Sequence, residues 1–280
     1  MEITADIVKK LRDATGAGMM DCKKALVKAE GDFAQAEKLL KEMGLAAVAK
    51  RSGRATNNGC AFVKKSAAKA VMLELVCETD FVARNEDFIA LGNQLCQDVL
   101  DHGYTEIVPE LELKVKELMA TIKENMALRR YHVFDIPSNG YVSHYIHGEG
   151  TMGTVVVMQA EDPNVFKNEQ VVAFANDLAL HVAAFNPLYL SSKHVDEAYL
   201  KEQTEIFTAQ TLSLGKPEKV VAGIVQGKMN KHLSEVCFLQ QPFVKDDSQS
   251  VEKVMQSLSK EVGSNLSIGS YLCYKVGVED

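Results

Sequence analysis

The stretch Glu78-Thr79-Asp80-Phe81-Val82 places a carboxylate directly beside a large aromatic side chain. A carboxylate can accept hydrogen bonds or repel another negative charge, and an aromatic ring can enter an apolar pocket of a binding partner. A second interpretation is structural, because Phe81 could instead staple the following helix to its own protein. Both interpretations stay open on the local sequence alone.

Other residues that could carry chemistry are not grouped in a catalytic pattern. The chain has no G-x-x-x-x-G-K-S/T phosphate loop, and the G-x-G-x-x-G spacing of Gly148, Gly150 and Gly153 follows an expected strand but precedes no helix, so we expect the chain itself to bind no nucleotide. Gly148-Glu149-Gly150 lies between two expected strands and predicts a turn. His144 and His147 are three positions apart on a strand and would point to opposite faces, which argues against a shared metal site. We therefore predict no catalytic residue, no metal, no cofactor and no enzymatic activity.

A strand and a helix are expected to flank the carboxylate and the aromatic ring. Residues 70–77 form an apolar run rich in Val and Leu, which predicts a buried strand. Apolar residues then recur at spacings of three and four, which predicts a helix that ends before Gly103; they are Phe88, Leu91, Leu95 and Val99. Thr79 and Asp80 are therefore expected in the turn between the strand and the helix, where a rigid corner could face a partner.

The composition is that of a soluble globular chain with room for two or three modules: 280 residues, of which 46% are hydrophobic and 25% charged. No apolar run approaches the roughly 18 residues of a membrane span, and no signal or transit segment is visible, so we expect a cytoplasmic protein. The cysteines form no C-x-x-C pair and mostly fall on apolar faces, which predicts reduced core thiols; they are Cys22, Cys60, Cys77, Cys96, Cys237 and Cys273.

Charge is unevenly distributed along the chain. The net charge of −7 argues against general nucleic-acid binding, yet residues 1–54 carry a small positive excess. No acidic residue occurs between Glu42 and Glu74, whereas this segment holds six cations: Lys50, Arg51, Arg54, Lys64, Lys65 and Lys69. Such a segment could steer a negatively charged partner, or it could be a solvated linker with a basic bias. The charge pattern leaves both open.

The first module, residues 1–54, is predicted to contain three short helices and the start of a linker that spans residues 45–58. Thr4 and Asp32 are in position to cap the first and third helices, and glycines separate the three. The adjacent pair Met19-Met20 suits contact with a partner's apolar surface better than the reading of DNA base edges. We therefore expect this module to contact a protein.

The rest of the chain predicts an α+β fold with two strand-strand-helix subdomains built on antiparallel sheets. The first is expected at residues 55–138, and the second at residues 139–190 together with 234–280, where Asp162-Pro163 should cap the covering helix. Between the two parts of the second subdomain, residues 191–233 show apolar side chains at a spacing of seven, Leu200, Phe207 and Leu214. This spacing predicts an inserted antiparallel helical hairpin.

Two motifs resemble signatures of a known family, translation elongation factor Ts. The run from Thr15 to Leu26, TGAGMMDCKKAL, is similar to the family's N-terminal signature, and Thr79-Asp80-Phe81-Val82 is similar to its central one. The resemblance extends through His147-Gly148, Gly215-Lys216-Pro217 and Gln241-Pro242-Phe243-Val244. The family usually has Gln at the position of Glu78, and some members continue into an additional C-terminal helix.

The resemblance implies a guanine nucleotide exchange factor that binds GDP-bound elongation factor Tu. It implies that Thr79, Asp80, Phe81 and Val82 form a wedge that presses near the Mg²⁺ and nucleotide of that GTPase. It also implies docking contacts through a UBA-like first module and one further position: Val8, Arg12, Met19, Met20, Lys23 and His147. Hairpins such as residues 191–233 serve self-association or partner contact in the family, so the resemblance leaves open a homodimer through the hairpin, while a simple packed helix pair remains the structural alternative.

One alternative from another functional class remains. The basic linker could bind RNA or the ribosome, and steep salt dependence of RNA affinity would reveal such phosphate contacts. On the exchange-factor interpretation we expect elongation factor Tu as the partner, no membrane association and no direct contact with nucleic acid.

Overall fold

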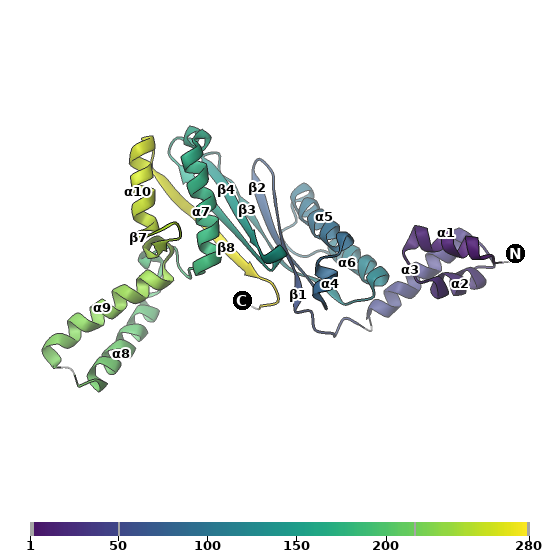
Figure 1. Cartoon of the computed structure of the whole chain (residues 1–280), viewed down its shortest axis with the longest axis horizontal. Helices are drawn as coiled ribbons and strands as arrows, with labels where there is room; N and C mark the ends of the chain where they lie inside the picture. Colours follow the sequence, from purple (N-terminus) through teal and green to yellow (C-terminus); the bar gives the residue numbers. More distant parts are fainter. Residues whose placement is uncertain (1–2, 50, 216, 279–280) are drawn as a thin grey trace. The chain divides into compact units, whose positions relative to one another are not determined.

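The computed structural model describes residues 3–49, 51–215 and 217–278, and it divides into two compact units (Figure 1). Unit 1 comprises the chain up to Phe134, together with Ile146–Gly153 and the last segment from Tyr274. Unit 2 comprises Asp135–Tyr145 and Thr154–Cys273. Helices and antiparallel strands occur together, which confirms the predicted α+β class, while the predicted subdomain boundaries stay predictions.

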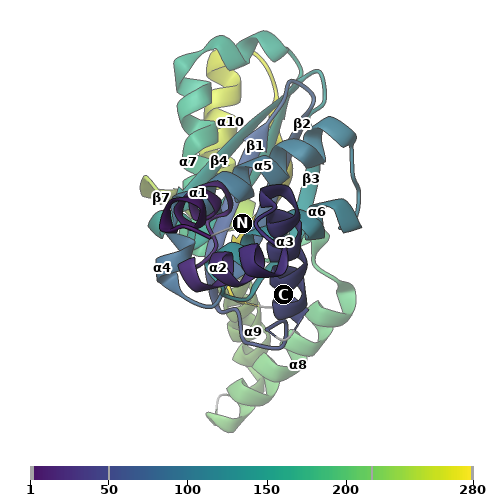
Figure 2. The same cartoon turned by 90° about the vertical axis from the view of Figure 1, so that its right-hand side faces the viewer.

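Three helices begin unit 1: α1 (Ala5–Thr15), α2 (Met19–Lys28) and α3 (Phe33–Ala49). Figure 2 shows them together at the N-terminal end of the chain. Gly16 ends α1 with φ 66°, a left-handed conformation that glycine adopts readily. Asp32 Oδ1 accepts a hydrogen bond from Gln35 N at 2.9 Å and so caps α3. The helices share a small apolar core of Val8, Leu11, Cys22, Ala25, Leu26, Ala29, Ala36 and Leu40.

The predicted start of the linker at residue 45 is wrong, because α3 continues to Ala49. The apolar run there extends the helix, and Val48 is buried in the core that lies under the first sheet. After the helix, Arg51 Nη1 donates a hydrogen bond to Met119 O at 3.4 Å. Lys50, one of the cations of the predicted linker, lies outside the described residues.

The first sheet has the order β1-β2-β3, with β1 (Asn58–Lys65), β2 (Lys69–Cys77) and β3 (Met126–Asp135). β1 and β2 pair antiparallel. Two helices, α5 (Glu86–His102) and α6 (Pro109–Ile122), bury apolar faces in the same core as β1 and β2. A Cβ on Gly92 of α5 would lie 2.3 Å from the Phe62 ring, so only glycine permits this close approach to β1.

Glu74 of β2 is a fully buried acid that ties three segments of unit 1 together. Its carboxylate lies 3.4 Å from Arg129 Nη1 and 2.7 Å from Arg130 Nε, both on β3. It also accepts a hydrogen bond of 2.9 Å from Gly277 N near the end of the chain. A buried carboxylate is tolerated only when it is paired and hydrogen-bonded in this way.

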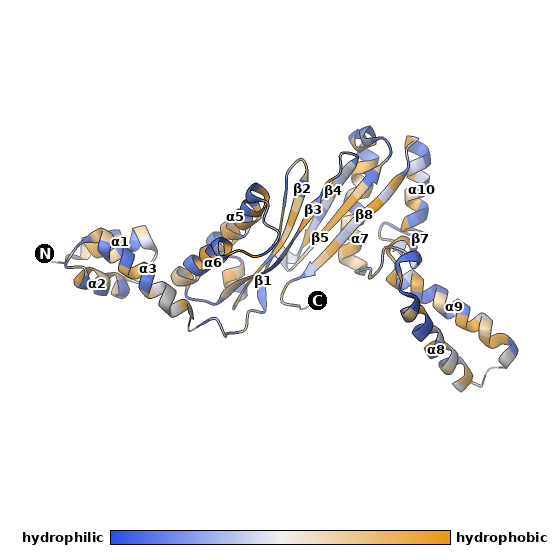
Figure 3. Ribbon diagram, turned by 180° about the vertical axis from the view of Figure 1, so that it is seen from behind, coloured by the Kyte–Doolittle hydropathy of each residue, from blue (hydrophilic) through white to orange (hydrophobic). Residues whose placement is uncertain are grey.

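The second sheet has the order β4-β5-β8, with β4 (Gly140–His147), β5 (Met152–Ala160) and β8 (Leu266–Lys275). A short 3-10 turn, Gly148–Gly150, joins β4 to β5. In unit 2, α7 (Glu169–Phe185) and α10 (Val251–Val262) share a buried core with this sheet. Figure 3 shows that β5 and α7 are rich in hydrophobic residues.

Three short elements complete this core. A 3-10 turn at Phe238–Gln240 leads to a two-stranded ribbon of β6 (Pro242–Phe243) and β7 (Asp246–Ser250).

The prediction that Asp162 caps α7 is wrong. Asp162 caps a separate 3-10 helix, Pro163–Lys167. The cap of α7 is Asn168, whose Oδ1 accepts a hydrogen bond from Gln170 N at 2.8 Å. Proline fits the first turn of a 3-10 helix as well as that of an α-helix, so Asp162-Pro163 did not indicate which kind of helix begins there.

The predicted helical hairpin is confirmed as α8 (Glu197–Ser213) and α9 (Glu218–Val236), preceded by a 3-10 turn at Ser192–His194. Tyr199 Oη and His232 Nε2 are hydrogen-bonded at 2.8 Å between the two helices. Leu214, the last of the three apolar residues spaced by seven, is 67% exposed, because α8 ends at Ser213. Self-association through the hairpin stays a prediction.

All six cysteines are free thiols, and five are buried, which confirms the predicted core role. None of the helices in the described parts of the chain is long and apolar enough to cross a membrane.

His181 of α7 is a fully buried histidine whose ring nitrogens are both hydrogen-bonded. Its Nε2 lies 2.9 Å from Gln241 Oε1, and its Nδ1 accepts from Val244 N at 3.2 Å, which fits the neutral ring with its proton on Nε2. Burial lowers the pKa of His181 below its usual 6.5, and the weaker effect of the bond to Gln241 acts in the opposite direction.

We predict that His181 makes the fold sensitive to acid. The unfolded chain binds a proton that the folded chain excludes, so stability present above about pH 6.5 is lost as the pH falls below it, by at most about 1.4 kcal/mol per pH unit. Melting temperatures measured from pH 7.5 to 5 should fall less steeply for His181→Gln than for the unaltered chain. His102→Gln, at an exposed histidine, is the control. Equal slopes in all three proteins would contradict the prediction.

Candidate functional site

Thr79 and Asp80 lie between β2 and α5, as predicted, and the corner there contains a single helical turn, α4 (Asp80–Ala83). Thr79 caps it, because its Oγ1 accepts a hydrogen bond from Val82 N at 3.3 Å. Asn85 then caps α5 by accepting from Asp87 N at 2.9 Å. Two capped helix starts within seven residues hold the backbone of the corner in one conformation.

The corner exposes its aromatic ring. Phe81 is 83% exposed and Asp80 is exposed, whereas Val82 and Ala83 are 8% and 7% exposed and belong to the core of unit 1. Successive residues of a helix point about 100° apart, so a turn that buries two neighbours must turn the two before them outward. The staple interpretation of Phe81 is therefore wrong. The prediction that Val82 contacts a partner also needs correction, since its side chain is in the core.

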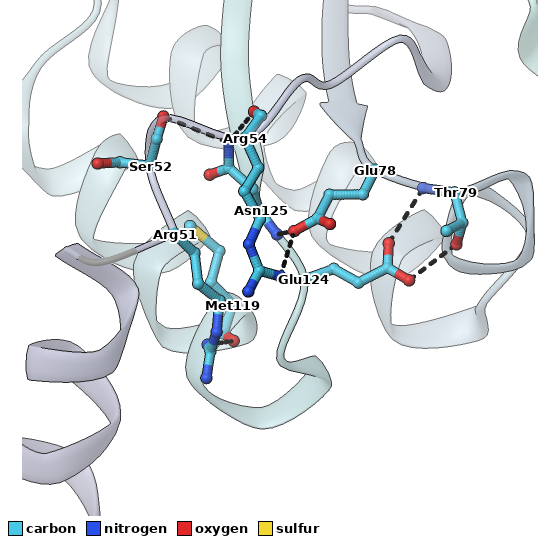
Figure 4. Close-up of polar contacts among 8 residues, drawn as sticks. All are labelled: Arg51, Ser52, Arg54, Glu78, Thr79, Met119, Glu124 and Asn125. Carbon is cyan, nitrogen blue, oxygen red and sulfur yellow. Dashed lines mark hydrogen bonds and ion pairs between the residues drawn. The ribbon is translucent and has the colours of Figure 1, made fainter.

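Two acids, Glu124 and Glu78, link the corner to neighbouring segments through hydrogen bonds (Figure 4). Glu124 accepts two hydrogen bonds from Thr79, one from its backbone N at 3.1 Å and one from its Oγ1 at 2.8 Å. Glu78 Oε1 accepts from Asn125 N at 2.6 Å and lies 3.3 Å from Arg54 Nη1. Hydrogen bonds to charged acceptors are about twice as strong as neutral ones. The loop after α6 therefore fixes the start of α4.

The segment after α3 is attached to the same loop. Asn125 is 5% exposed, and its Nδ2 donates to Arg54 O at 2.7 Å and to Ser52 O at 3.4 Å. Because Arg51 and Arg54 both take part in contacts within unit 1, two cations of the predicted basic linker have structural roles. This weakens the alternative that the linker serves mainly to bind RNA.

A buried thiol adds a further contact to the corner. Cys77 Sγ donates to Thr79 O at 3.1 Å. Burial raises the pKa of Cys77 to about 12, and the charge of Glu124 adds to the shift. The thiol therefore keeps the proton that it donates.

The loop that follows His147 lies beside α4 within unit 1. Cys60 Sγ is 3.4 Å from both Ala83 O and Glu149 O, and burial raises the pKa of Cys60 to about 11, so the thiol stays protonated. A Cβ on Gly150 would lie 2.8 Å from Cys60 Sγ, so the loop backbone is pressed against the thiol. A cavity of about 110 Å³ between the loop and the corner is lined by residues that include Asp80, Ala83, Gly148 and Glu149.

Three charged residues that line this cavity form two ion pairs, with Arg84 between Glu149 and Asp80. Arg84 Nε lies 3.0 Å from Glu149 Oε2, and Arg84 Nη2 lies 3.8 Å from Asp80 Oδ2. The Arg84–Glu149 pair links the corner to the loop that follows the exposed His147, and Asp80, Phe81 and His147 all belong to unit 1. In the described parts of the chain, no group of three or more His, Cys, Asp or Glu residues could hold a metal ion.

The remaining predicted contact residues lie on α1 and α2. Met19 and Met20 are 42% and 65% exposed, and Arg12 and Lys23 are exposed as well. Val8 is 5% exposed and lies in the core of the three helices, so its predicted docking role needs correction. The apolar periodicity that placed Val8 on the inner face of α1 was the signal for burial.

Sequence reasoning missed four residues of this site: Arg84, Glu124, Asn125 and Glu149. Nothing in their spacing indicates a shared site, since Glu124 contacts a threonine 45 positions earlier in the chain. The only local signal was the i,i+4 spacing of Asp80 and Arg84, which is typical of an ion pair on a helix.

Comparison with known proteins bears directly on this site. A family model described as Elongation factor TS matches residues 78–278, a segment that begins at the corner. The elongation factor Ts of Treponema denticola is 48% identical over 278 residues, which cover 99% of each chain. The chain belongs to the elongation factor Ts family. That of Treponema pallidum is 47% identical over the full length of both chains, and that of Borreliella burgdorferi is 42% identical over 98% of this chain and 99% of its own.

Membership of the elongation factor Ts family gives the chain a role in translation elongation. The relatives in the elongation factor Ts family also align with the first module, which precedes the segment that the family model matches.

We predict that Glu124 holds the corner in place. Glu124→Ala leaves Thr79 without two hydrogen bonds and should lower the free energy of unfolding by about 1 to 3 kcal/mol. Amide hydrogen exchange at Thr79 and Val82 should become faster. Glu112→Ala on α6, which removes only an exposed pair with Lys116, is the matched control and should change stability by no more than about 0.5 kcal/mol. Unchanged protection of both amides in Glu124→Ala would contradict the bracing role.

Proposed function

We propose that this chain is a guanine nucleotide exchange factor that binds GDP-bound elongation factor Tu and promotes GDP release. The observation that carries the proposal is Phe81, whose side chain is 83% exposed on a helical turn held by caps and charged hydrogen bonds. A monomeric domain gains nothing from an exposed aromatic ring on so constrained a backbone, whereas a binding partner with an apolar pocket would bury it.

The corner suits a mechanical task. A GTPase holds its nucleotide through backbone donors, a lysine and Mg²⁺, all of which depend on accurate placement. Displacing that arrangement by about an ångström should weaken nucleotide binding greatly. Phe81 would be the apolar wedge, and the carboxylate of Asp80 would accept a hydrogen bond or repel negative charge near the Mg²⁺. The braced backbone matters here, because a flexible loop would yield instead of displacing its target.

The first module would dock on the GTPase and keep the wedge at its target. Met19 and Met20 offer adaptable apolar contacts, Arg12 and Lys23 offer charge, and His147 would add a contact beside the corner. Coupling between two ligands of one protein is reciprocal, so nucleotide must weaken the binding of this chain by the same factor by which this chain weakens nucleotide. No covalent chemistry is required, so the proposal describes an exchange factor rather than an enzyme.

We predict that Phe81→Ala reduces exchange without unfolding the chain. Burying a Phe side chain in a partner contributes roughly 1.5 to 3 kcal/mol, so the efficiency of GDP release should fall roughly ten- to a hundredfold. The melting temperature should stay the same, because the ring is exposed in the free chain. Stopped-flow release of labelled GDP from elongation factor Tu, at graded concentrations of the variant, measures the effect.

Ile89→Ala on α5 is the matched control for Phe81→Ala, since it truncates another exposed apolar side chain close in sequence to the corner. It should leave exchange unchanged. Normal exchange by Phe81→Ala would reject the wedge, and failure of the unaltered chain to release GDP would reject the proposed function as a whole.

The docking role of the first module leads to a separate prediction. Met19→Ala with Met20→Ala should raise the concentration of the chain that gives half-maximal exchange about tenfold, while the melting temperature changes little because both side chains are exposed. Val27→Ala, at an exposed apolar residue of the same helix, is the control. A large loss of stability with unchanged half-maximal concentration would assign the methionines to the core instead.

A further inference from the structure

Arg84 lies between two carboxylates of unit 1 and contacts them unequally. Its Nε lies 3.0 Å from Glu149 Oε2, within hydrogen-bond distance, while its Nη2 lies 3.8 Å from Asp80 Oδ2, beyond that distance. Asp80 is the first residue of α4 and Arg84 is its C-cap, four residues later, a spacing at which an acid and a base can pair directly. The guanidinium is therefore drawn toward Glu149 and away from its local partner.

Glu149 is held in place by its own loop. It has φ 56°, an uncommon conformation for a residue other than glycine, and its carbonyl oxygen lies 3.4 Å from Cys60 Sγ. The next residue, Gly150, has no room for a side chain because Cys60 lies directly against it. The backbone that carries the Glu149 carboxylate is therefore fixed beside α4, and the carboxylate is available to hold Arg84.

Without this contact Arg84 would compete for Asp80. All three side chains are more than half exposed, so the guanidinium can rotate between partners without crossing a packed core. If the charge on Glu149 were removed, the nearest carboxylate for Arg84 would be Asp80. A direct pair there would cover the carboxylate that the proposed function assigns to the GTPase.

We propose that Glu149 is a positioning residue for nucleotide exchange: it retains Arg84 and thereby leaves the Asp80 carboxylate accessible to the GTPase. This inference rests on the proposed function. Glu149 itself does not contact nucleotide or Mg²⁺ in this scheme, and its effect reaches them only through Arg84 and Asp80. The role depends on charge, so a neutral side chain of the same shape cannot replace it.

The test is Glu149→Gln, with GDP release from elongation factor Tu as the measurement. Exchange efficiency should fall roughly two- to fivefold, the range expected for competition between exposed ion pairs. The ratio of variant to unaltered chain should return toward one at about 1 M salt, where exposed charges are screened over about 3 Å. The melting temperature should not change, since the pair is exposed.

Two further variants separate this role from a purely structural one. Arg84→Gln removes the competing cation, so its exchange should be at least as efficient as that of the unaltered chain, and adding Glu149→Gln to it should have no further effect. In an Asp80→Asn background, Glu149→Gln should likewise have no effect, because there is no carboxylate left to cover. A double-mutant cycle in exchange efficiency measures this dependence on background, whereas the melting temperature should be the same in every variant because the side chains are exposed.

The outcomes distinguish this inference from the proposed function. If Asp80→Asn lowers exchange but Glu149→Gln does not, the positioning role is rejected and the wedge stands. If Arg84→Gln and Glu149→Gln lower exchange equally, the ion pair acts as a clasp between loop and corner, and the proposed competition for Asp80 is wrong. If Asp80→Asn and Phe81→Ala both exchange normally, the wedge is rejected together with the positioning role, whereas only failure of the unaltered chain to release GDP rejects the proposed function itself.

Discussion

The burial of Val82 and Ala83 is the constraint on which the exposed corner depends. These two residues belong to the core of unit 1, and the helical turn that buries them leaves Asp80 and Phe81 on the outside. The outward position of Asp80 and Phe81 is thus a consequence of packing. A substitution that loosened this core would lower the free energy of unfolding and would also change the direction in which Phe81 points. The stability of the core and the orientation of Phe81 therefore depend on the same contacts.

Acidic side chains secure the surroundings of that turn. Glu124 holds Thr79, Glu78 holds the loop after α6, and Glu74 joins β2 to β3 and to the end of the chain. A carboxylate with several donors around it is costly to disturb, because removing one partner leaves charge without compensation. Such contacts hold the corner in one geometry, which the proposed displacement of nucleotide would require.

The two surfaces assigned to the partner differ in stiffness. The corner is capped and braced, whereas the first module presents two flexible methionines on a small bundle. In the proposed function, adaptable apolar side chains would tolerate an imperfect fit during docking, and a rigid corner would then act on the nucleotide site. Asp80 differs from both in being next to an ion pair, because Arg84 lies 3.8 Å from its Oδ2 and 3.0 Å from Glu149 Oε2.

The sequence by itself predicted most of the local structure. The three N-terminal helices, the β1–β2 pair, α5 and the helical hairpin follow from apolar periodicity, caps and glycines, which are properties of neighbouring residues. The two motifs that resemble elongation factor Ts were local as well, and the family is confirmed. Errors occurred at boundaries, such as the end of α3 and the cap of α7, where two local signals competed.

Only the tertiary structure decided what the site residues do. It placed Val8 and Val82 in cores and left Phe81 outside, a choice that depends on which face of a helix meets a sheet. It also brought Glu124 to Thr79 and Glu149 to Arg84, pairs separated by tens of residues in the chain. Hydrogen-bond and ion-pair partners of this kind are selected by the folded arrangement of whole segments, so residue type and spacing could not reveal them.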